Sequence, residues 1–436
     1  MIYRIKGLAV STESTFGVAS TGSYARVNMA GDIQFEAKSD AQERPVLKSG
    51  IWKDAQFVTT KAGSTLSFSV PLHSFLPVGS TYSAPANHQL ADLLKHCMGT
   101  SSLGPAVVET NGNGSTYTTG TIDGGVFSDF SAPGLYAMSM ANSITQARNV
   151  TSSVATAGPL YNATIAGSWL TTSGAATSPL IGDTIYGANN ICTSTSAEFP
   201  SSFTFEVWGD TFSDVTPTDA YILTGCCGTF SVNSTVGAVP MVSFSFSVSN
   251  WTETYVSNLQ AAAIAIAHVT NVYSDPLIST YGQVSAHYYL GATGGNPVSS
   301  SHLSAVSWEL TLGNEMMGAP SINCSNGVSR WVKTGMSTTG SITVYFTNNL
   351  YGMFNPASDN FDSIHIYIQT GNEPGKMCCI YIPNAIVTEQ LKIVDIGGIS
   401  GHQINFRTGY SKLTEAGNSS ATISNQADSD LRIGFF

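Results

Sequence analysis

Alternation of apolar and polar residues over short stretches dominates this chain. The clearest run is Val242–Val248, in which Val and Phe alternate with Ser. A period of two places all the apolar side chains of a strand on one face. The other face is mostly Ser, Thr or a single charge, which is typical of an antiparallel sheet with one solvated or weakly polar face. Six further runs alternate in the same way: 66–70, 203–207, 308–312, 342–346, 364–368 and 404–406.

Helical periodicity is clear in one place. Between Asn87 and Met98, apolar residues recur at positions 90, 93, 94, 97 and 98, which form one helix face. Asn87 is a good N-cap and Gly99 suits the C-terminal end. A second stretch, 258–269, is rich in alanine and fits either a helix or a strand. With Gly, Asn and Pro between the runs, the pattern predicts an all-β antiparallel sandwich or barrel with one flanking α-helix.

Residues 101–195 differ from the rest of the chain. Asn, Gly, Ser, Thr and Ala crowd this stretch, and clean alternation is rare. We interpret it as an inserted loop-rich or decoration region of short strands and long loops. The predicted domain organisation is therefore a β domain made of 1–100 and 196–436, interrupted by the insertion at 101–195.

Charge is scarce along the 436 residues. The chain has 17 basic and 28 acidic residues, a formal net charge of −11, and its charged fraction is 10%, against about 25% in an average soluble domain. This composition argues against disorder, helical bundles and general nucleic-acid binders, which depend on Lys and Arg to neutralise phosphates. A surface with so little charge favours a large assembly in which copies of the chain cover one another.

The sequence shows no targeting signal that we recognise. No apolar run of signal-peptide length follows Arg4 and Lys6, and the longest apolar stretch, 261–267, is too short to span a bilayer. We expect a protein made and kept in a cytoplasm, with no membrane contact.

Candidate chemistry is sparse. The seven cysteines include two adjacent pairs, Cys226–Cys227 and Cys378–Cys379, but no Cys-x-x-Cys, so we expect small buried side chains. The eight histidines are dispersed, and neither a nucleophile elbow nor a phosphate-binding glycine motif occurs. Glu206 and Glu309 lie within alternating runs, where each could face a sugar cleft, a neighbouring subunit or a lumen. We expect no enzyme and no catalytic, cofactor-binding or metal-binding residue.

The order of these features resembles the major tail tube proteins of tailed bacteriophages, over most of residues 40–256 and 300–410. The resemblance begins with a strand pair around Thr60–Leu72, followed by the helix ending at Gly99. Further segments carry it: Tyr221–Val232, Val239–Val248, Ser307–Asn314, Cys379–Ala385, Asp395–Ile399 and a last strand at 403–407. The insertion at 101–195 departs from the simplest members of that family.

The resemblance implies a virion structural protein of the phage tail, made in the host cytoplasm. Such subunits form hexameric rings that stack into a tube, through which genome DNA passes without specific binding. Its partners would be copies of itself and the tape measure, tail terminator and tail-tip proteins. Closure into a tube would also remove exposed sheet edges. The strands expected to build the shared wall are centred on Phe205, Phe244, Phe246, Leu310 and Val344, with their Ser/Thr faces toward the lumen or a neighbour.

Two other functions remain open. One is a receptor-binding or baseplate/tail-tip β-protein, possibly carbohydrate-binding, for which exposed aromatic residues would speak; the candidates are His287–Tyr289 and Trp251. The other is a secreted hydrolase, which the missing signal peptide disfavours. A tube subunit differs from a binding module because it forms rings or polymers on its own.

Overall fold

The structure is a computed structural model in which antiparallel strands predominate and one helix is described. It confirms the predicted all-β class with one α-helix. The described residues are 5–22, 24–27, 29–31, 33–38, 40–48, 51–60, 63–73, 89–103, 108–110, 121–126, 134–139, 145–155, 160–166, 169–171, 175–177, 184–187, 189–193, 201–209, 219–255, 282–289, 299–324, 327–345, 354, 363–373, 376–408 and 431–436. The ambiguous stretch 258–269 and the proposed N-cap Asn87 lie outside them.

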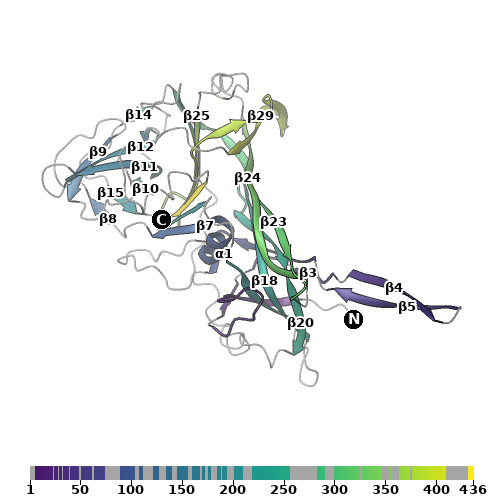
Figure 1. Ribbon diagram of the computed structural model, residues 1–436. Coiled ribbons are helices and arrows are strands. Elements are labelled where there is room, and N and C mark those ends of the chain that lie inside the picture. The colour runs from purple at the N-terminus through teal and green to yellow at the C-terminus, as the bar shows by residue number, and fades with distance from the viewer. Residues whose placement is uncertain are drawn as a thin grey trace.

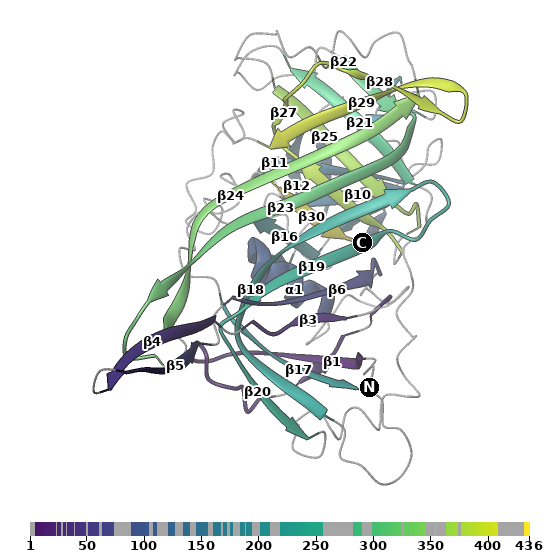
Figure 2. The same cartoon turned by 90° about the vertical axis from the view of Figure 1, so that its right-hand side faces the viewer.

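The largest sheet has thirteen strands and forms one wall of the molecule (Figure 2). Its strands are β1 (Ile5–Thr12), β2 (Ala25–Arg26), β3 (Gln34–Glu36), β6 (Ser64–Pro71), β17 (Phe203–Gly209), β18 (Asp219–Thr235), β19 (Met241–Val248), β20 (Asn250–Tyr255), β23 (Ala305–Pro320), β24 (Val328–Tyr345), β27 (Ala385–Val387), β28 (Lys392–Ile396) and β29 (Ile399–Thr408). Every alternating run named above, apart from 364–368, falls on one of these strands, although β24 is described only to Tyr345.

Strand β18 connects two parts of this sheet. Its first half pairs with β17 and β20, and its second half pairs with β19 and β23. Gly225 lies at the changeover with a φ of 62°, a conformation that glycine adopts without steric cost. A Cβ there would lie 2.6 Å from the Cβ of Ser249, so a larger residue would displace the neighbouring turn.

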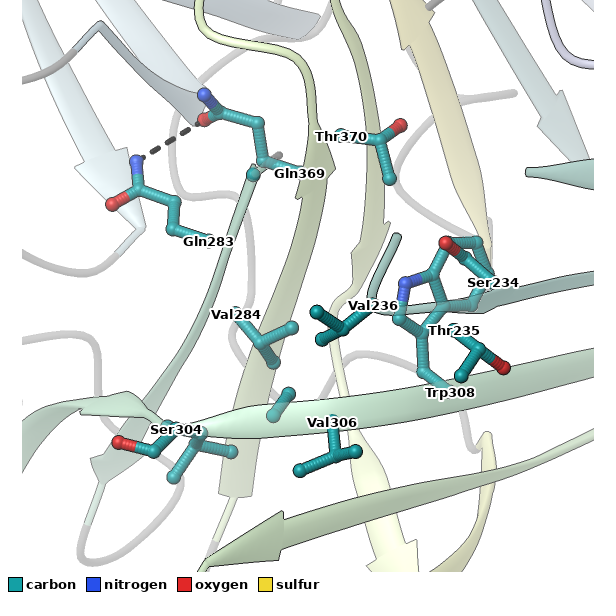
Figure 3. Close-up of a pocket in the computed structure, with 13 residues that line it drawn as sticks. Ser234, Thr235, Val236, Gln283, Val284, Ser304, Val306, Trp308, Gln369 and Thr370 are labelled. Atoms are coloured by element: carbon teal, nitrogen blue, oxygen red, sulfur yellow. Dashed lines mark hydrogen bonds between the residues drawn. The ribbon is translucent and has the colours of Figure 1, made fainter. Parts of the chain in front are cut away.

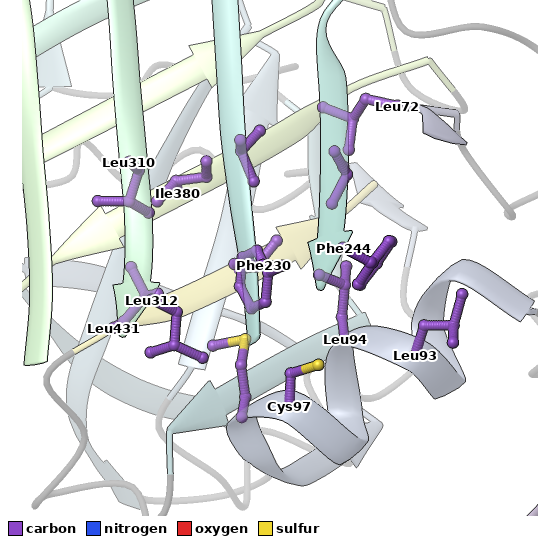
Figure 4. Packing of buried hydrophobic residues seen from close by; sticks show 14 of the residues in the cluster. Leu72, Leu93, Leu94, Cys97, Phe230, Phe244, Leu310, Leu312, Ile380 and Leu431 are labelled. Atoms are coloured by element: carbon purple, nitrogen blue, oxygen red, sulfur yellow. The ribbon is translucent and has the colours of Figure 1, made fainter. Parts of the chain in front are cut away.

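A seven-stranded sheet packs against the apolar face of the large sheet. Its strands are β7 (Gly99–Leu103), β16 (Asn189–Thr193), β21 (Gly282–Tyr289), β22 (Ser299–Leu303), β25 (Ser363–Thr370), β26 (Cys378–Ile382) and β30 (Arg432–Phe435). Leu310 and Leu312 of the large sheet join Ile380 and Leu431 in one buried cluster (Figure 4). The two sheets therefore form the predicted sandwich around a continuous core.

Helix α1 (Gln89–Met98) closes one side of this core. Leu93, Leu94 and Cys97 are all buried, and Figure 4 shows Leu94 and Cys97 turned toward Phe244 and Phe230 of the sheet. The predicted apolar helix face is thus confirmed. No helix in the described part of the chain combines the length and hydropathy that crossing a membrane requires.

A third sheet, of six strands, covers the other face of the seven-stranded sheet (Figure 1). It lies within the stretch predicted to be loop-rich and comprises β8 (Val108–Thr110), β9 (Thr121–Val126), β10 (Gly134–Ser139), β11 (Gln146–Ala155), β12 (Leu160–Ala166) and β15 (Thr184–Gly187). A short pair, β13 (Trp169–Leu170) and β14 (Ala176–Thr177), follows β12. Strands β7 and β16, which precede β8 and follow β15, belong to the seven-stranded sheet, although β16 lies within 101–195.

The middle sheet corrects one expectation. Strand β25 alternates as predicted, but both of its faces are buried. Ile366 and Ile368 face the large sheet, whereas Tyr367 packs against β10 and β11 of the six-stranded sheet. The polar face of this run is therefore covered by protein, because the chain supplies a third layer.

Two hairpins extend on the same side of the molecule. They are the long β23–β24 hairpin and the separate pair β4 (Asp40–Lys48) and β5 (Ile51–Thr60) (Figure 2). The turns β18–β19 and β28–β29 lie at the opposite side of the sheet. The strand pair expected around Thr60–Leu72 is wrong, since β5 pairs with β4 while β6 pairs with β19 and β3.

Candidate functional site

The outer face of the large sheet carries an array of short polar side chains. We call it the hydroxyl face, and none of its residues is buried. Its residues are Thr65, Ser67, Ser69, Thr229, Ser231, Asn233, Thr235, Ser243, Ser245, Ser247, Ser307, Glu309, Thr311, Ser337, Thr339, Ser341, Thr343, Gln403, Asn405 and Arg407. It spans six neighbouring strands, β6, β19, β18, β23, β24 and β29.

Strand register aligns these side chains in rows. One row runs through Ser69, Ser243, Ser231, Thr311, Thr339 and Arg407, one residue from each strand. At roughly 4.8 Å between strands, the row extends over about 24 Å. The hydroxyls of Ser69 and Ser243 lie 2.9 Å apart, within hydrogen-bond distance. Neighbouring strands thus present their hydroxyls side by side across the sheet.

Fixed charge is nearly absent from the hydroxyl face. Glu309 and Arg407 are its charged members, and Glu309 is paired in register with Asn233 and Ser341. The remaining residues, apart from Thr229, whose hydroxyl oxygen is buried, offer hydrogen bonds to water without attracting counterions. A phosphate polymer in contact with this face would meet few cations: Arg407, and at the β28 margin the exposed Lys392, which is paired in register with Gln403. Cations are the main source of affinity for nucleic acids.

The opposite side of the same strands is densely apolar. Phe205, Phe244, Phe246, Leu310 and Val344, the residues predicted to centre the wall strands, are all buried. The ring of Phe246 lies 4.9 Å from that of Phe205 and 6.0 Å from that of Phe244. The period-two pattern therefore separates a Phe-rich core from the hydroxyl face, as predicted.

Exposed large apolar residues gather at the two ends of the long strands. Val236 and Val239 lie on the β18–β19 turn, and Ile399 lies at the β28–β29 turn. At the far end, Met317 and Ile322 lie on the β23–β24 hairpin and its turn. Exposed apolar residues that gather in this way mark candidate interaction surfaces.

A small pocket opens beside the β18–β19 turn, between the two sheets of the sandwich (Figure 3). Its volume is about 250 Å³. Val236, Val284 and Val306 face one another around it, with Trp308 and Thr370 at its side (Figure 3). Sequence reasoning missed this pocket because its walls come from four separate parts of the chain.

The two carboxylates considered for glycoside hydrolysis do not form a matched pair. Glu206 is buried on β17, whereas Glu309 is exposed on the hydroxyl face of β23. Among the described residues, no group of three or more His, Cys, Asp and Glu side chains is placed to hold a metal ion. The alternating carboxylates thus occupy different environments in the fold.

One buried carboxylate was missed by the sequence reasoning. Glu13 follows β1 and accepts hydrogen bonds from the hydroxyls of Ser202 and Thr204, at 2.5 and 3.0 Å. It also accepts bonds from the backbone N–H groups of Gly17 and Gly225, at 2.9 and 2.8 Å. Both carboxylate oxygens are thus satisfied, and Glu13 ties the end of β1 to β17 and β18.

Histidines that are far apart in sequence meet between the seven- and six-stranded sheets. His287 on β21 is opposite His365 on β25, and both are fully buried. Burial lowers the pKa of His365 to about 3, and it lowers the pKa of His287 well below its usual value. His365 Nδ1 lies 2.7 Å from the hydroxyl of Tyr381, and the guanidinium of Arg148 lies 4.9 Å from the ring centre of Tyr367. These buried histidines belong to a polar layer that joins the two sheets.

The cysteines and aromatic candidates are largely internal. Cys226, Cys227, Cys378 and Cys379 are buried free thiols, as expected, and burial raises the pKa of each. The aromatic stretch proposed for glycan contact begins with the fully buried His287. Trp251, the other candidate, packs against Phe35 and Tyr221 at the margin of the core. Among the described side chains of these two candidates, His287 is buried and both Tyr288 and Trp251 pack against the core.

Comparison with known proteins adds no assignment: no protein-family model matches the chain, and no curated protein matches it with significant similarity.

Proposed function

We propose that this protein is the self-assembling subunit of a bacteriophage tail tube, a virion structural protein without enzymatic activity. Hexameric rings of the subunit would stack into a hollow conduit for genome DNA. The observation that carries the proposal is the hydroxyl face, a broad, solvated and almost uncharged surface on one continuous sheet. A lumen wall of this chemistry would remain hydrated and would let DNA slide, because cations that bind phosphates are scarce on it.

The long central strands support a wall-building role. Strands β18, β23 and β24 contain 17, 16 and 18 residues, whereas about 5–6 is usual. At about 3.3 Å per residue and a barrel tilt of 35–45°, a strand of 18 residues rises about 45 Å along the axis of a tube. We therefore expect rings that repeat at no more than about 45 Å along the tube.

Self-association would also cover the edges of the large sheet and the ends of its long strands. An open sheet leaves unpaired backbone groups at its margins, and closure with further copies removes that hazard. The exposed apolar residues at both ends of the long strands would then be covered by neighbouring copies. Tape measure, tail terminator and tail-tip proteins would be the further partners of such a tube.

Negative-stain electron microscopy combined with size-exclusion chromatography tests the proposal. The purified chain, taken to high concentration, should form six-fold rings or hollow filaments. A clean monomer or trimer would refute the tube function and favour a receptor-binding or tail-tip protein, to be followed by glycan-binding assays.

A further inference from the structure

The pocket and the hairpin turn occupy opposite ends of the same strand. β23 begins beside the pocket, which Ala305, Val306 and Trp308 help to line, and it ends at Pro320 immediately before the turn. Successive copies displaced along this strand would bring the turn of one copy next to the pocket of another. The displacement would be about 50 Å for 16 residues of extended chain.

The pocket suits a side chain better than a ligand of drug size. Its volume of about 250 Å³ lies below the roughly 300–1,000 Å³ of typical small-molecule sites. Three valines form its apolar centre, and none of the described residues that line it is charged. Val236 at its rim is 65% exposed, so the pocket is open to an approaching partner.

The turn after β23 offers a matching side chain. Ile322 is fully exposed there, and the described turn residues, 321–324 and Gly327, are uncharged. The turn is held in shape by backbone hydrogen bonds from the N–H of Ser321 to the carbonyl of Gly327 (2.8 Å) and from the N–H of Gly327 to the carbonyl of Cys324 (2.9 Å). The indole N–H of Trp331 also donates to the carbonyl of Gly225 (2.8 Å), which anchors the hairpin to β18. A side chain presented on a preorganised turn loses little entropy when it docks.

We propose that Ile322 at the β23–β24 turn of one copy inserts into the pocket formed by Val236, Val284 and Val306 of the next copy. This inference rests on the proposed self-assembly and names the contact that joins successive rings. Because knob and pocket are different surfaces of one chain, the contact is heterologous and can repeat without limit along an axis. The described residues of the turn and of the pocket carry no charge that would lose its hydration when the two surfaces meet.

Disulfide trapping tests the contact directly. Cys324 is two residues from Ile322 and is partly exposed, whereas the other cysteines whose burial is described are buried. In Val236→Cys, an inserted Ile322 would bring Cys324 close enough for a disulfide, which needs Cα atoms about 4.4–6.8 Å apart. Mild oxidation of the assembled variant should then give a ladder of covalent oligomers on non-reducing gels. The double variant Val236→Cys, Cys324→Ser is the matched control and should give no ladder.

A substitution at the knob provides an independent measurement. Ile322→Asp changes a fully exposed side chain, so the subunit should fold normally and its association along the tube should weaken about ten- to a hundredfold. Val18→Asp, at an exposed apolar residue that belongs to neither the turn nor the pocket, should assemble like the wild type.

The outcomes separate the two proposals. If the wild type forms tubes but Val236→Cys gives no Cys324-dependent ladder, or if Ile322→Asp forms tubes equally well, the knob-and-pocket contact is overturned and the tube function is left standing. A wild-type chain that never assembles and never crosslinks would overturn both. A ladder together with the loss of stacking in Ile322→Asp would support both.

Discussion

Lysines placed on the hydroxyl face should give this surface a measurable, salt-dependent affinity for DNA. Ser69, Ser231 and Thr339 belong to one row and lie on alternate strands, β6, β18 and β24. Their Cα atoms are separated by about 9.6 Å per step, which avoids the repulsion between like charges on adjacent strands. All three side chains are solvent-accessible, so the triple lysine variant should keep the stability of the wild type within about 1–2 kcal/mol.

The expected gain follows from counterion release. Each phosphate neutralised adds about −0.9 to the slope of log K against log salt concentration, so three lysines add about −2.7. Between 50 and 200 mM salt, this slope alone corresponds to a loss of about 40-fold in affinity. The wild-type row contributes one cation, Arg407, and we expect its binding through this face to be too weak to measure.

Fluorescence anisotropy with a short duplex, titrated at several salt concentrations, measures this slope. The matched control carries glutamine at the same three positions, which adds comparable length without charge. A folded lysine variant that binds no better than the glutamine control would refute the accessibility of the hydroxyl face to DNA. Tight, strongly salt-dependent binding by the wild type would refute the inert-wall reasoning itself.

Three further predictions concern the fold. Phe246→Asp should abolish folding because it buries an unpaired charge, and Phe246→Ala should lower the free energy of unfolding in urea by about 3–5 kcal/mol. Ser245→Asp, at the exposed neighbouring position, should change this free energy by about 0.5 kcal/mol or less. Normal melting of Phe246→Asp would contradict the strand assignment. Glu13→Ala leaves three buried donors and one partly buried donor without their acceptor and should lower the unfolding free energy by about 2–3 kcal/mol, a loss that an unchanged urea midpoint would exclude. Burial lowers the pKa of His365 to about 3, whereas an unfolded histidine titrates near 6.5. The unfolded chain therefore binds the proton more readily, and the unfolding free energy should fall as the pH is lowered from ~6.5 to ~3. In His365→Gln this pH dependence should flatten by up to ~1.4 kcal/mol per pH unit, and identical pH profiles of variant and wild type would contradict the lowered pKa.

The sequence was sufficient to predict strands whose two faces differ in polarity. Val242–Val248 could be assigned as a strand because each Phe or Val contacts the core and each Ser faces away from it. The helix ending at Met98 was predictable for the same reason, since its apolar residues recur at the helical period. Both elements are determined by local sequence, so neither required knowledge of the strand order.

Features that depend on distant pairing could not be predicted. Ser231 meets Ser243 and Thr311 because β18 pairs with β19 and β23, although Thr311 is 80 positions further along the chain. The Glu13 site and the pocket arise in the same way, from separate segments that carry no shared motif. Alternation also reports a difference in polarity rather than contact with water, which is why the polar face of β25 could be mistaken for a solvated one.

The two polar faces of the sandwich have different chemistry, and the difference bears on function. The layer between the seven- and six-stranded sheets holds Arg148, Arg432 and His365, all buried and engaged with aromatic rings or polar partners. The open hydroxyl face, in contrast, has its single cation, Arg407, on the β29 side. The chain has 17 basic residues, yet one of them lies on the hydroxyl face, while two arginines, Arg148 and Arg432, are buried between the sheets. Low overall charge alone therefore does not account for the scarcity of charge on the hydroxyl face, and such a scarcity is what the proposed conduit for a polyanion would require.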